Sequence, residues 1–285
     1  GLDRNQVEPM LEGLCEKGLV VDIHLDGAYR YMPAPFVIGI FEFTMMRMGS
    51  SDADVGKYAK LFVDYLAGGE FYTANFKDRQ QVSVARVLPH LDHLGDHVEI
   101  LDYEKVDRVI EEAEYFSLSN CSCRHKKHHA GGEVCKVPLE TCTSFGKGAD
   151  YLVRRGMARE ISRAEMKDVA QRSKELKLVF SVDNVQNQPG FLCHCCGCCC
   201  GILRGITEYG IANSVAYANY FAVIDPDLCV GCGTCIERCQ VGAITEGHGF
   251  SVVDRSRCIG CGLCVTGCPN DVARLDPKPE AEVVH

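Results

Sequence analysis

The spacing of apolar residues near the start of the chain predicts a helix followed by a β-hairpin. In "QVEPMLEGLCEKG" apolar side chains recur every three or four positions, with Asn5 as N-cap and Gly18 at the end. The apolar face of this helix consists of Val7, Met10, Leu11 and Leu14. The next stretch, "LVVDIHLDGAYRYMPA", alternates around Asp26-Gly27, which is typical of a hairpin with a two-residue turn. We expect Cys15, the lone cysteine here, to be a small buried residue.

A helix followed by a two-stranded wing resembles the second half of a winged-helix domain, which is a DNA-binding scaffold in many regulators. The chain begins with Gly1 in the middle of such a unit, so we expect residues upstream to be missing. Residues 1–30 carry six acidic and three basic side chains, and an acidic helix repels phosphate. We therefore predict a docking or structural role for residues 1–46 and no contact with nucleic acid.

Helical periodicity returns in three later stretches. Residues 54–66 ("DVGKYAKLFVDYL") and 103–116 ("YEKVDRVIEEAEYF") have helical spacing. Ser162 and Glu165 form a capping box for a helix over residues 162–177. Together with the hairpin, these stretches predict an α+β fold.

The histidines of "PHLDHLGDH", which are His90, His93 and His97, are three and four residues apart. This spacing could place them on one helix face as metal ligands, but Pro89 and Gly95 weaken such a helix. We interpret them as surface or loop histidines.

The composition of the chain is unusual in one residue type, because 19 of the 285 residues are cysteine. The chain is long enough for two or three domains, and no run is apolar for long enough to span a bilayer. No secretory signal is visible, so clustered thiols indicate metal ligands in a reducing cytoplasm rather than a disulfide framework. The formal net charge of −9 argues against a general nucleic-acid surface.

Two strings near the C-terminus repeat one cysteine register. "CVGCGTCIERC" has the spacing C-x2-C-x2-C-x3-C, and "CIGCGLCVTGCP" has it again. The first string contains Cys229, Cys232, Cys235 and Cys239, and the second contains Cys258, Cys261, Cys264 and Cys268. A zinc site built from two C-x2-C knuckles would leave four of these cysteines unexplained.

This repeat is similar to bacterial-type ferredoxins that hold two [4Fe–4S] clusters, and the resemblance covers about a fifth of the chain. It implies that three cysteines of one string and the last of the other bind each cluster. Cluster I would use Cys229, Cys232, Cys235 and Cys268, and cluster II would use Cys258, Cys261, Cys264 and Cys239. Pro269 follows Cys268 as in the family, whereas Gln240 follows Cys239, a departure that we expect to change local packing more than ligation.

A third cysteine-rich string, "CHCCGCCC" at residues 193–200, matches the start of that register, C-x2-C-G-x-C. We predict a wall shared by two iron–sulfur sites, with Cys193, Cys196 and Cys199 facing one and Cys195 and Cys198 facing the other. Cys121, Cys123, Cys135 and Cys142 would complete both ligand sets and Cys200 would be spare, which makes three or four clusters in all. A single cluster with bystander thiols remains an alternative.

Two other features bear on this middle region. The basic run from Arg124 to His129 would lower thiolate pKa values, and histidine ligation or a zinc site there is a further alternative. "CCG" at residues 195–197 resembles the hallmark of a domain of heterodisulfide reductase subunits, in which such cysteines hold a non-cubane iron–sulfur site. The family's second CCG is missing here, so this resemblance implies only a catalytic alternative.

The absence of any flavin, nicotinamide, nucleotide or haem motif favours one-electron relay over organic-cofactor chemistry. We predict a cytoplasmic iron–sulfur electron-transfer protein without catalytic residues, passing electrons between partner subunits of an anaerobic oxidoreductase complex. A reductase with a catalytic middle-domain cluster and a redox-sensing winged-helix regulator are the alternatives. The expected domains are a winged-helix-like unit (1–46), a mostly helical linker region (47–118), a Cys-rich iron–sulfur domain (119–218), a ferredoxin-like domain (219–277) and a flexible tail (278–285).

Overall fold

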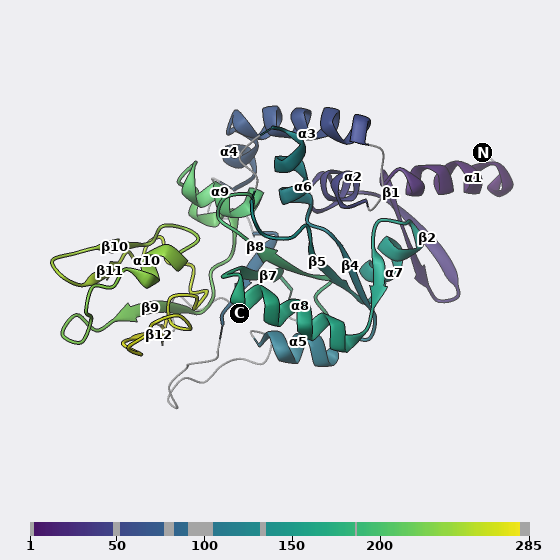
Figure 1. The fold of residues 1–285 in the computed structure, drawn as a ribbon. Coiled ribbons are helices and arrows are strands. Elements are labelled where there is room, and N and C mark those ends of the chain that lie inside the picture. Colours follow the sequence, from purple (N-terminus) through teal and green to yellow (C-terminus); the bar gives the residue numbers. More distant parts are fainter. Residues whose placement is uncertain are drawn as a thin grey trace. The chain divides into compact units, whose positions relative to one another are not determined.

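The computed structural model describes residues 3–47, 52–76, 83–90, 105–131, 135–185 and 187–279. Most of its elements are labelled in Figure 1. Contacts within the chain divide it into two compact units, and each unit combines two stretches of sequence. Unit 1 comprises Gly1–Ala67 with Ala113–Ser162, and unit 2 comprises Gly68–Glu112 with Arg163–His285.

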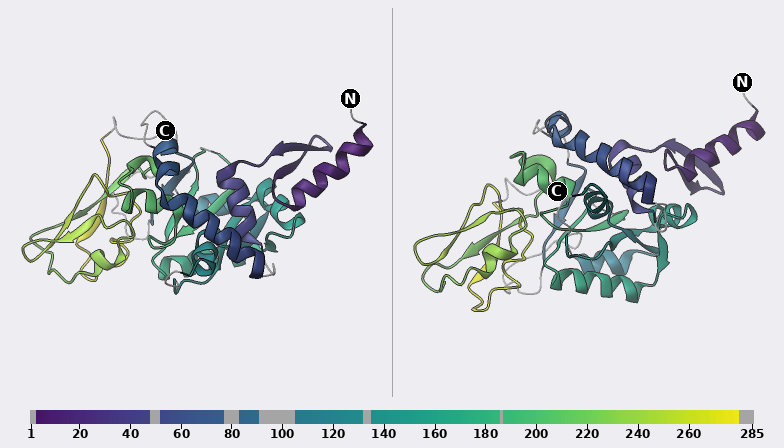
Figure 2. Two further views of the ribbon diagram at one scale, coloured as in Figure 1. Left: turned by 90° about the horizontal axis from the view of Figure 1, so that it is seen from above. Right: turned by 45° about the horizontal axis from the view of Figure 1, so that its top comes forward.

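Unit 1 begins with the predicted helix and hairpin. These are α1 (Arg4–Glu16), β1 (Val20–Leu25) and β2 (Ala28–Pro33), and α1 lies next to β1 in both views of Figure 2. Asp26 and Gly27 both have positive φ, 51° and 79°, as a two-residue hairpin turn requires. The helix starts one residue before Asn5, so Asp3 is the N-cap and the prediction of Asn5 as the cap is wrong.

The N-terminal segment is held to α7 (Gly146–Arg154) by a buried ion cluster. Asp22 on β1 is fully buried and accepts hydrogen bonds from Arg154 at 2.6 Å and from Arg155 at 3.0 Å. Arg155 also pairs with Glu12 of α1 at 2.7 Å. Burial alone would raise the pKa of Asp22, but the two guanidinium groups outweigh it and lower the pKa. Cys15 is buried as predicted, whereas Met10 on the expected apolar face is 64% exposed.

The rest of unit 1 packs helices on three antiparallel strands, in the order β5-β4-β6. Its further elements are α2 (Phe41–Met46), α3 (Asp52–Ala67), β4 (Phe116–Asn120), α6 (Ser122–His129), β5 (Glu140–Phe145) and β6 (Arg159–Ile161). Helices α2, α3 and α6 pack together around a cluster that includes Phe41, Met45 and Ala59. The helix predicted over residues 54–66 is confirmed by α3.

The first part of unit 2 combines three antiparallel strands, in the order β3-β7-β8, with helices. Its elements are α4 (Glu70–Phe76), β3 (Ala85–Leu88), α5 (Val106–Glu112), α8 (Arg163–Glu175), β7 (Val179–Asp183), β8 (Phe191–Cys195), α9 (Gly201–Thr207) and a 3-10 turn (Ala212–Ser214). The helix expected over residues 162–177 is confirmed by α8. The helix expected over 103–116 is shorter, because Phe116 already belongs to β4, whose residues are mostly buried.

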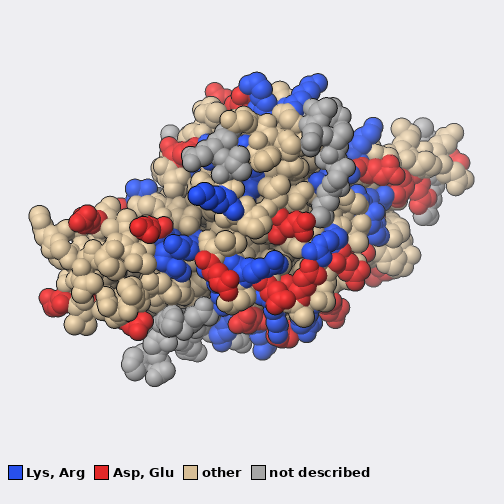
Figure 3. Space-filling model, in the orientation of Figure 1, with Lys and Arg blue, Asp and Glu red and all other residues tan. Residues whose placement is uncertain are grey.

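Helices α5 and α8 pack against each other and carry mixed charges on their exposed faces, as Figure 3 shows. Glu111 of α5 pairs with Arg163 at 3.2 Å and with Lys167 of α8. These are solvent-exposed pairs, so they add little stability but keep this face polar.

The second part of unit 2 contains both repeats of the cysteine register. It consists of β9 (Tyr220–Ile224) paired with β12 (Ala273–Pro277), β10 (Ile244–Glu246) paired with β11 (Ser251–Val253), and α10 (Thr234–Arg238). One hydrophobic core runs from Val87 and Val179 through Leu203 to Leu263 and Leu275, so both parts of unit 2 share it. The fold is α+β, as predicted. None of the helices in the described ranges is long and apolar enough to cross a membrane.

Candidate metal centres

The first of two cysteine-lined pockets in unit 2 contains the four residues expected for cluster I. We call this set the outer site: Cys229, Cys232, Cys235 and Cys268. Gly231 and Gly233 have φ of 66° and 77°, so the chain can wrap three thiols around one point within seven residues. The first turn of α10 carries Cys235, whose thiol donates a hydrogen bond to the Ser251 hydroxyl at 3.2 Å.

The second pocket contains the four residues expected for cluster II. We call this set the inner site: Cys258, Cys261, Cys264 and Cys239. Backbone N–H groups point at its sulfurs, from Ala243 to Cys239 Sγ at 3.1 Å and from Ala222 to Cys258 Sγ at 3.4 Å. Such bonds stabilise charge on cluster-bound sulfur.

Both pockets fit an iron–sulfur cluster by their donor chemistry. Each has four thiols, and in each pocket three come from one repeat and the fourth from the other. The crossed arrangement matches the sharing of cysteines in two-cluster ferredoxins, whereas two separate zinc knuckles would not cross.

The two sites differ in exposure and in thiol acidity. Cys232 of the outer site is exposed, and a hydrogen bond with the Thr234 hydroxyl lowers its pKa. Cys264 of the inner site is 7% exposed, and burial raises its pKa well above the usual value. The Cys264 thiol therefore keeps its proton until a metal displaces it.

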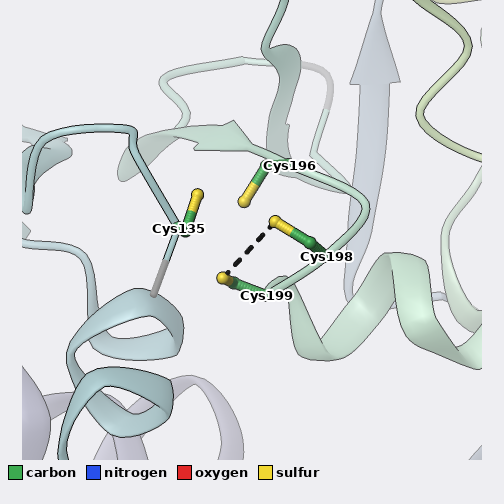
Figure 4. Close-up of side chains that lie close together, drawn as sticks. All are labelled: Cys135, Cys196, Cys198 and Cys199. Atoms are coloured by element: carbon green, nitrogen blue, oxygen red, sulfur yellow. Dashed lines mark hydrogen bonds between the residues drawn. The ribbon is translucent and has the colours of Figure 1, made fainter. Parts of the chain in front are cut away.

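A third group of thiols lies on the turn between β8 and α9. We call it the turn cluster: Cys196, Cys198 and Cys199, whose sulfur atoms lie within 4.8 Å of one another. Figure 4 shows the three sulfurs pointing toward one place, with Cys198 and Cys199 3.6 Å apart, and also draws Cys135, which belongs to unit 1. A hydrogen bond with Cys196, in which the Cys199 thiol is the donor, and burial raise the pKa of Cys199, as expected for crowded thiols.

The turn cluster differs in one member from the predicted set of Cys193, Cys196 and Cys199. Cys193 and Cys195 lie in β8, two positions apart and so on one side of that strand. Cys198 lies in the turn, where its sulfur meets those of Cys196 and Cys199. The predicted set assumes that the whole string is a loop, as in the ferredoxin register. The string is so rich in cysteine that its sequence does not indicate the strand that ends at Cys195. Cys200 is the N-cap of α9.

Three of the four upstream cysteines lie near the start of α6 in unit 1. Cys121 directly precedes α6, Cys123 is in its first turn and Cys142 is on β5. Burial raises the pKa of Cys121 to about 12, Arg124 opposes this, and the Cys123 and Cys142 thiols add to it. The predicted basic run is the helix α6 itself, and Arg124, His125 and Lys126 in it are buried. The predicted assignment of all these middle-region cysteines to clusters stays a prediction.

One histidine is placed differently from the prediction. His90 is 2% exposed, its ring Nε2 lies 2.8 Å from the Leu178 carbonyl oxygen, and its backbone N–H donates to Cys261 O at 2.9 Å. His90 lies in a loop after β3, as one form of the prediction has it, but it is not at the surface, because β7 and the inner site enclose it. His93 and His97 lie outside the described residues.

Comparison with known families supports the assignment of the two pockets. Residues 222–275 match the family model described as a 4Fe-4S dicluster domain, and this stretch includes all eight cysteines of the outer and inner sites. A search among curated proteins gives no match for the chain. Neither the winged-helix resemblance nor the CCG resemblance is confirmed. The protein therefore has a ferredoxin-like 4Fe-4S domain at residues 222–275 of unit 2, which supports the binding of at least one 4Fe-4S cluster.

Proposed function

We propose that the protein is a multi-cluster electron-transfer subunit that relays single electrons between partner subunits of an anaerobic oxidoreductase complex. The observation that carries this proposal is the pair of four-thiol pockets in one domain. Two clusters held by one small domain suit the passage of electrons, because electron transfer from one cluster to the other requires no substrate-binding site. The cysteines of the chain supply the ligands, and the bound clusters supply one-electron redox chemistry.

The surroundings of the outer site support exchange with a partner. Leu228 and Val230, on either side of Cys229, are 62% and 68% exposed, and Cys232 is exposed. On the face drawn in Figure 3, the part of unit 2 that carries β9 to β12 has mostly uncharged residues. Apolar side chains around an accessible redox site suit a transient protein partner, which is typical of electron-transfer encounters.

We further propose one or two clusters in the middle region, for three or four in total. The turn cluster supplies three thiolates, and a [4Fe–4S] cluster needs a fourth. Under the shared-wall hypothesis, that ligand comes from the upstream set of Cys121, Cys123, Cys135 and Cys142. We also propose a cytoplasmic location, because a reducing compartment keeps this many thiols available for iron.

The second candidate function is a reductase whose catalytic site is the middle-region cluster. The observation that favours it is the exposure of Cys198, since a substrate could reach a cluster held there. A DNA-binding regulator remains the third possibility raised by residues 1–46, and the acidic helix α1 opposes it.

Iron and sulfide analysis of the anaerobically purified protein tests the proposal. We expect about twelve or sixteen irons per chain, for three or four clusters. A content of about eight irons per chain would agree with two clusters in the dicluster domain and would exclude clusters in the middle region. Zinc in place of iron would overturn the proposal entirely. Turnover of a substrate by the isolated chain, or a non-cubane signal in the spectra, would favour the reductase instead.

A further inference from the structure

The side chain of Gln240 joins the inner site to the turn cluster within unit 2. Its Oε1 accepts a hydrogen bond from the Gly197 N–H at 2.8 Å. Its Nε2 donates to the Lys177 carbonyl oxygen at 2.9 Å, in the turn that leads from α8 to β7. One amide therefore bonds to two separate turns, and its own backbone follows Cys239 of the inner site.

Gly197 lies between two members of the turn cluster and packs directly on the backbone of Gln240. A Cβ built on Gly197 would overlap the Gln240 carbonyl oxygen and lie 3.1 Å from its carbonyl carbon. The glycine is thus needed because the two backbones approach more closely than any side chain allows. Cys196 and Cys198, on either side of it, are held by the same contact.

The position of Gln240 in the repeat makes this contact informative. The equivalent residue of the second repeat is Pro269, which follows Cys268. Proline has neither a side-chain donor nor a side-chain acceptor, so it could not make either of the two bonds of Gln240. The departure from the repeated motif thus coincides with the point where the inner site meets another group of thiols.

We propose that Gln240 is a positioning residue that fixes the turn cluster against the inner site, which makes these two sites a pair that exchanges electrons within unit 2, in addition to the outer and inner sites. This rests on the proposed function. In the exchange, one site loses one electron and the other gains it, with no bond broken and no proton moved. A one-electron donor such as dithionite supplies the electron in the test below.

The test compares three variants of the full-length, iron-loaded protein. Gln240→Leu keeps the size of the side chain and removes both hydrogen bonds, whereas Gln240→Glu keeps an acceptor for the Gly197 N–H and loses the donor to Lys177. Gln171→Leu is the matched control, because Gln171 is exposed on α8 and its amide donates a hydrogen bond to Glu175 of the same helix at 3.2 Å. The readouts are iron content, amide hydrogen exchange at Gly197, and magnetic coupling between clusters in the dithionite-reduced protein.

In Gln240→Leu we expect unchanged iron, exchange at Gly197 faster by about fivefold, and weaker magnetic coupling. Gln240→Glu should recover most of the protection at Gly197, and Gln171→Leu should match the unmodified protein. Unchanged exchange and coupling in Gln240→Leu would overturn the inference. If Gln240→Leu does not fold, Gln240→Glu supplies the test. Hydrogen exchange at Gly197 equal to that of the unmodified protein, together with lost magnetic coupling, would then overturn the inference. The bond that Gln240 accepts from the Gly197 N–H would in that case not set the coupling. If the unmodified protein has only about eight irons, the middle cluster of the proposed function is refuted, and electron exchange between the turn cluster and the inner site is refuted with it. Hydrogen exchange at Gly197 would still decide whether Gln240 holds the turn.

Discussion

The two repeats of the dicluster domain carry the same cysteine register in different surroundings. In the first repeat Cys232 is exposed, and a Cβ on the following Gly233 would meet nothing within 4 Å. In the second repeat the equivalent Gly262 lies against the chain, because a Cβ there would be 2.6 Å from the His90 carbonyl oxygen. One sequence motif thus builds an open site and an enclosed site.

This difference separates what the motif determines from what the rest of the chain determines. The register predicts which thiols meet, since both pockets have the expected four thiols. The surrounding elements decide how each site is reached. The inner site contacts segments outside the dicluster domain at His90 and, through Gln240, at Gly197, so it suits exchange within the protein. The outer site suits exchange with a partner.

The largest expected effect comes from removing one ligand from each site. Both Cys264→Ser and Cys232→Ser should lose about four irons per chain. Cys264→Ser also leaves a buried hydroxyl, which costs about 1–3 kcal/mol if it finds no partner, so its melting temperature should fall further. Iron analysis and thermal unfolding measure both effects. Equal melting temperatures for the two variants would show that the inner site is no more integral to the fold than the outer one.

A smaller effect comes from adding one methyl group at equivalent glycines. Gly233→Ala and Gly262→Ala share the strain of a positive φ, 77° and 76°, which costs about 1–2 kcal/mol. Only Gly262→Ala also forces a Cβ against the His90 backbone, and such overpacking adds about 1–3 kcal/mol. Denaturant unfolding of the two iron-loaded variants therefore isolates the contact with His90. A Gly233→Ala variant that is as unstable as Gly262→Ala would contradict this account of the enclosed repeat.

Removal of iron by a chelator should distinguish the sites kinetically. Because Cys232 is exposed and Cys264 is buried, iron should leave the outer site first, followed by a slower phase from the inner site. The time course is measured by the absorbance of the chelator complex. In Cys232→Ser the fast phase should be absent. Its persistence in that variant would assign the fast phase to another site, with the exposed Cys198 of the turn cluster as the candidate.

The ligand sets of the dicluster domain were predictable, whereas the surroundings were not. The spacing of the eight cysteines carries the chemistry locally, since a tight loop needs only its own residues to gather three thiols. The burial of His90 and the bridge made by Gln240 depend on residues more than 40 positions away in the sequence. For the same reason, helical periodicity placed α3 and α8 but overestimated α5, because the burial of Phe116 in β4 outweighs local preference.

The string "CHCCGCCC" shows where periodicity alone stops being informative. With six cysteines in eight positions, several registers fit, and the choice depends on where β8 ends. The strand runs through Cys195, so the thiols after it fall in a turn, and Cys198 joins Cys196 and Cys199. A strand boundary shifted by two residues would have changed which sulfurs meet.

The smallest expected effect concerns the acidity of one outer ligand. The Thr234 hydroxyl lies 3.5 Å from Cys232 Sγ and lowers the pKa of that thiol, while the equivalent residue of the inner repeat is Leu263. A thiol with a lowered pKa stays ionised to lower pH, so its bond to iron resists acid further. In Thr234→Leu the pKa of Cys232 rises, and acid-induced iron loss from the outer site should begin at a higher pH than in the unmodified protein, because the thiolate loses a hydrogen bond that stabilises it. Acid titration of iron release in the two proteins measures the shift, and the slow, inner-site phase serves as an internal control that should not move. A shift of both phases would mean that Thr234 stabilises the whole domain rather than the acidity of one thiol, and the outer site would then differ from the inner one in exposure alone.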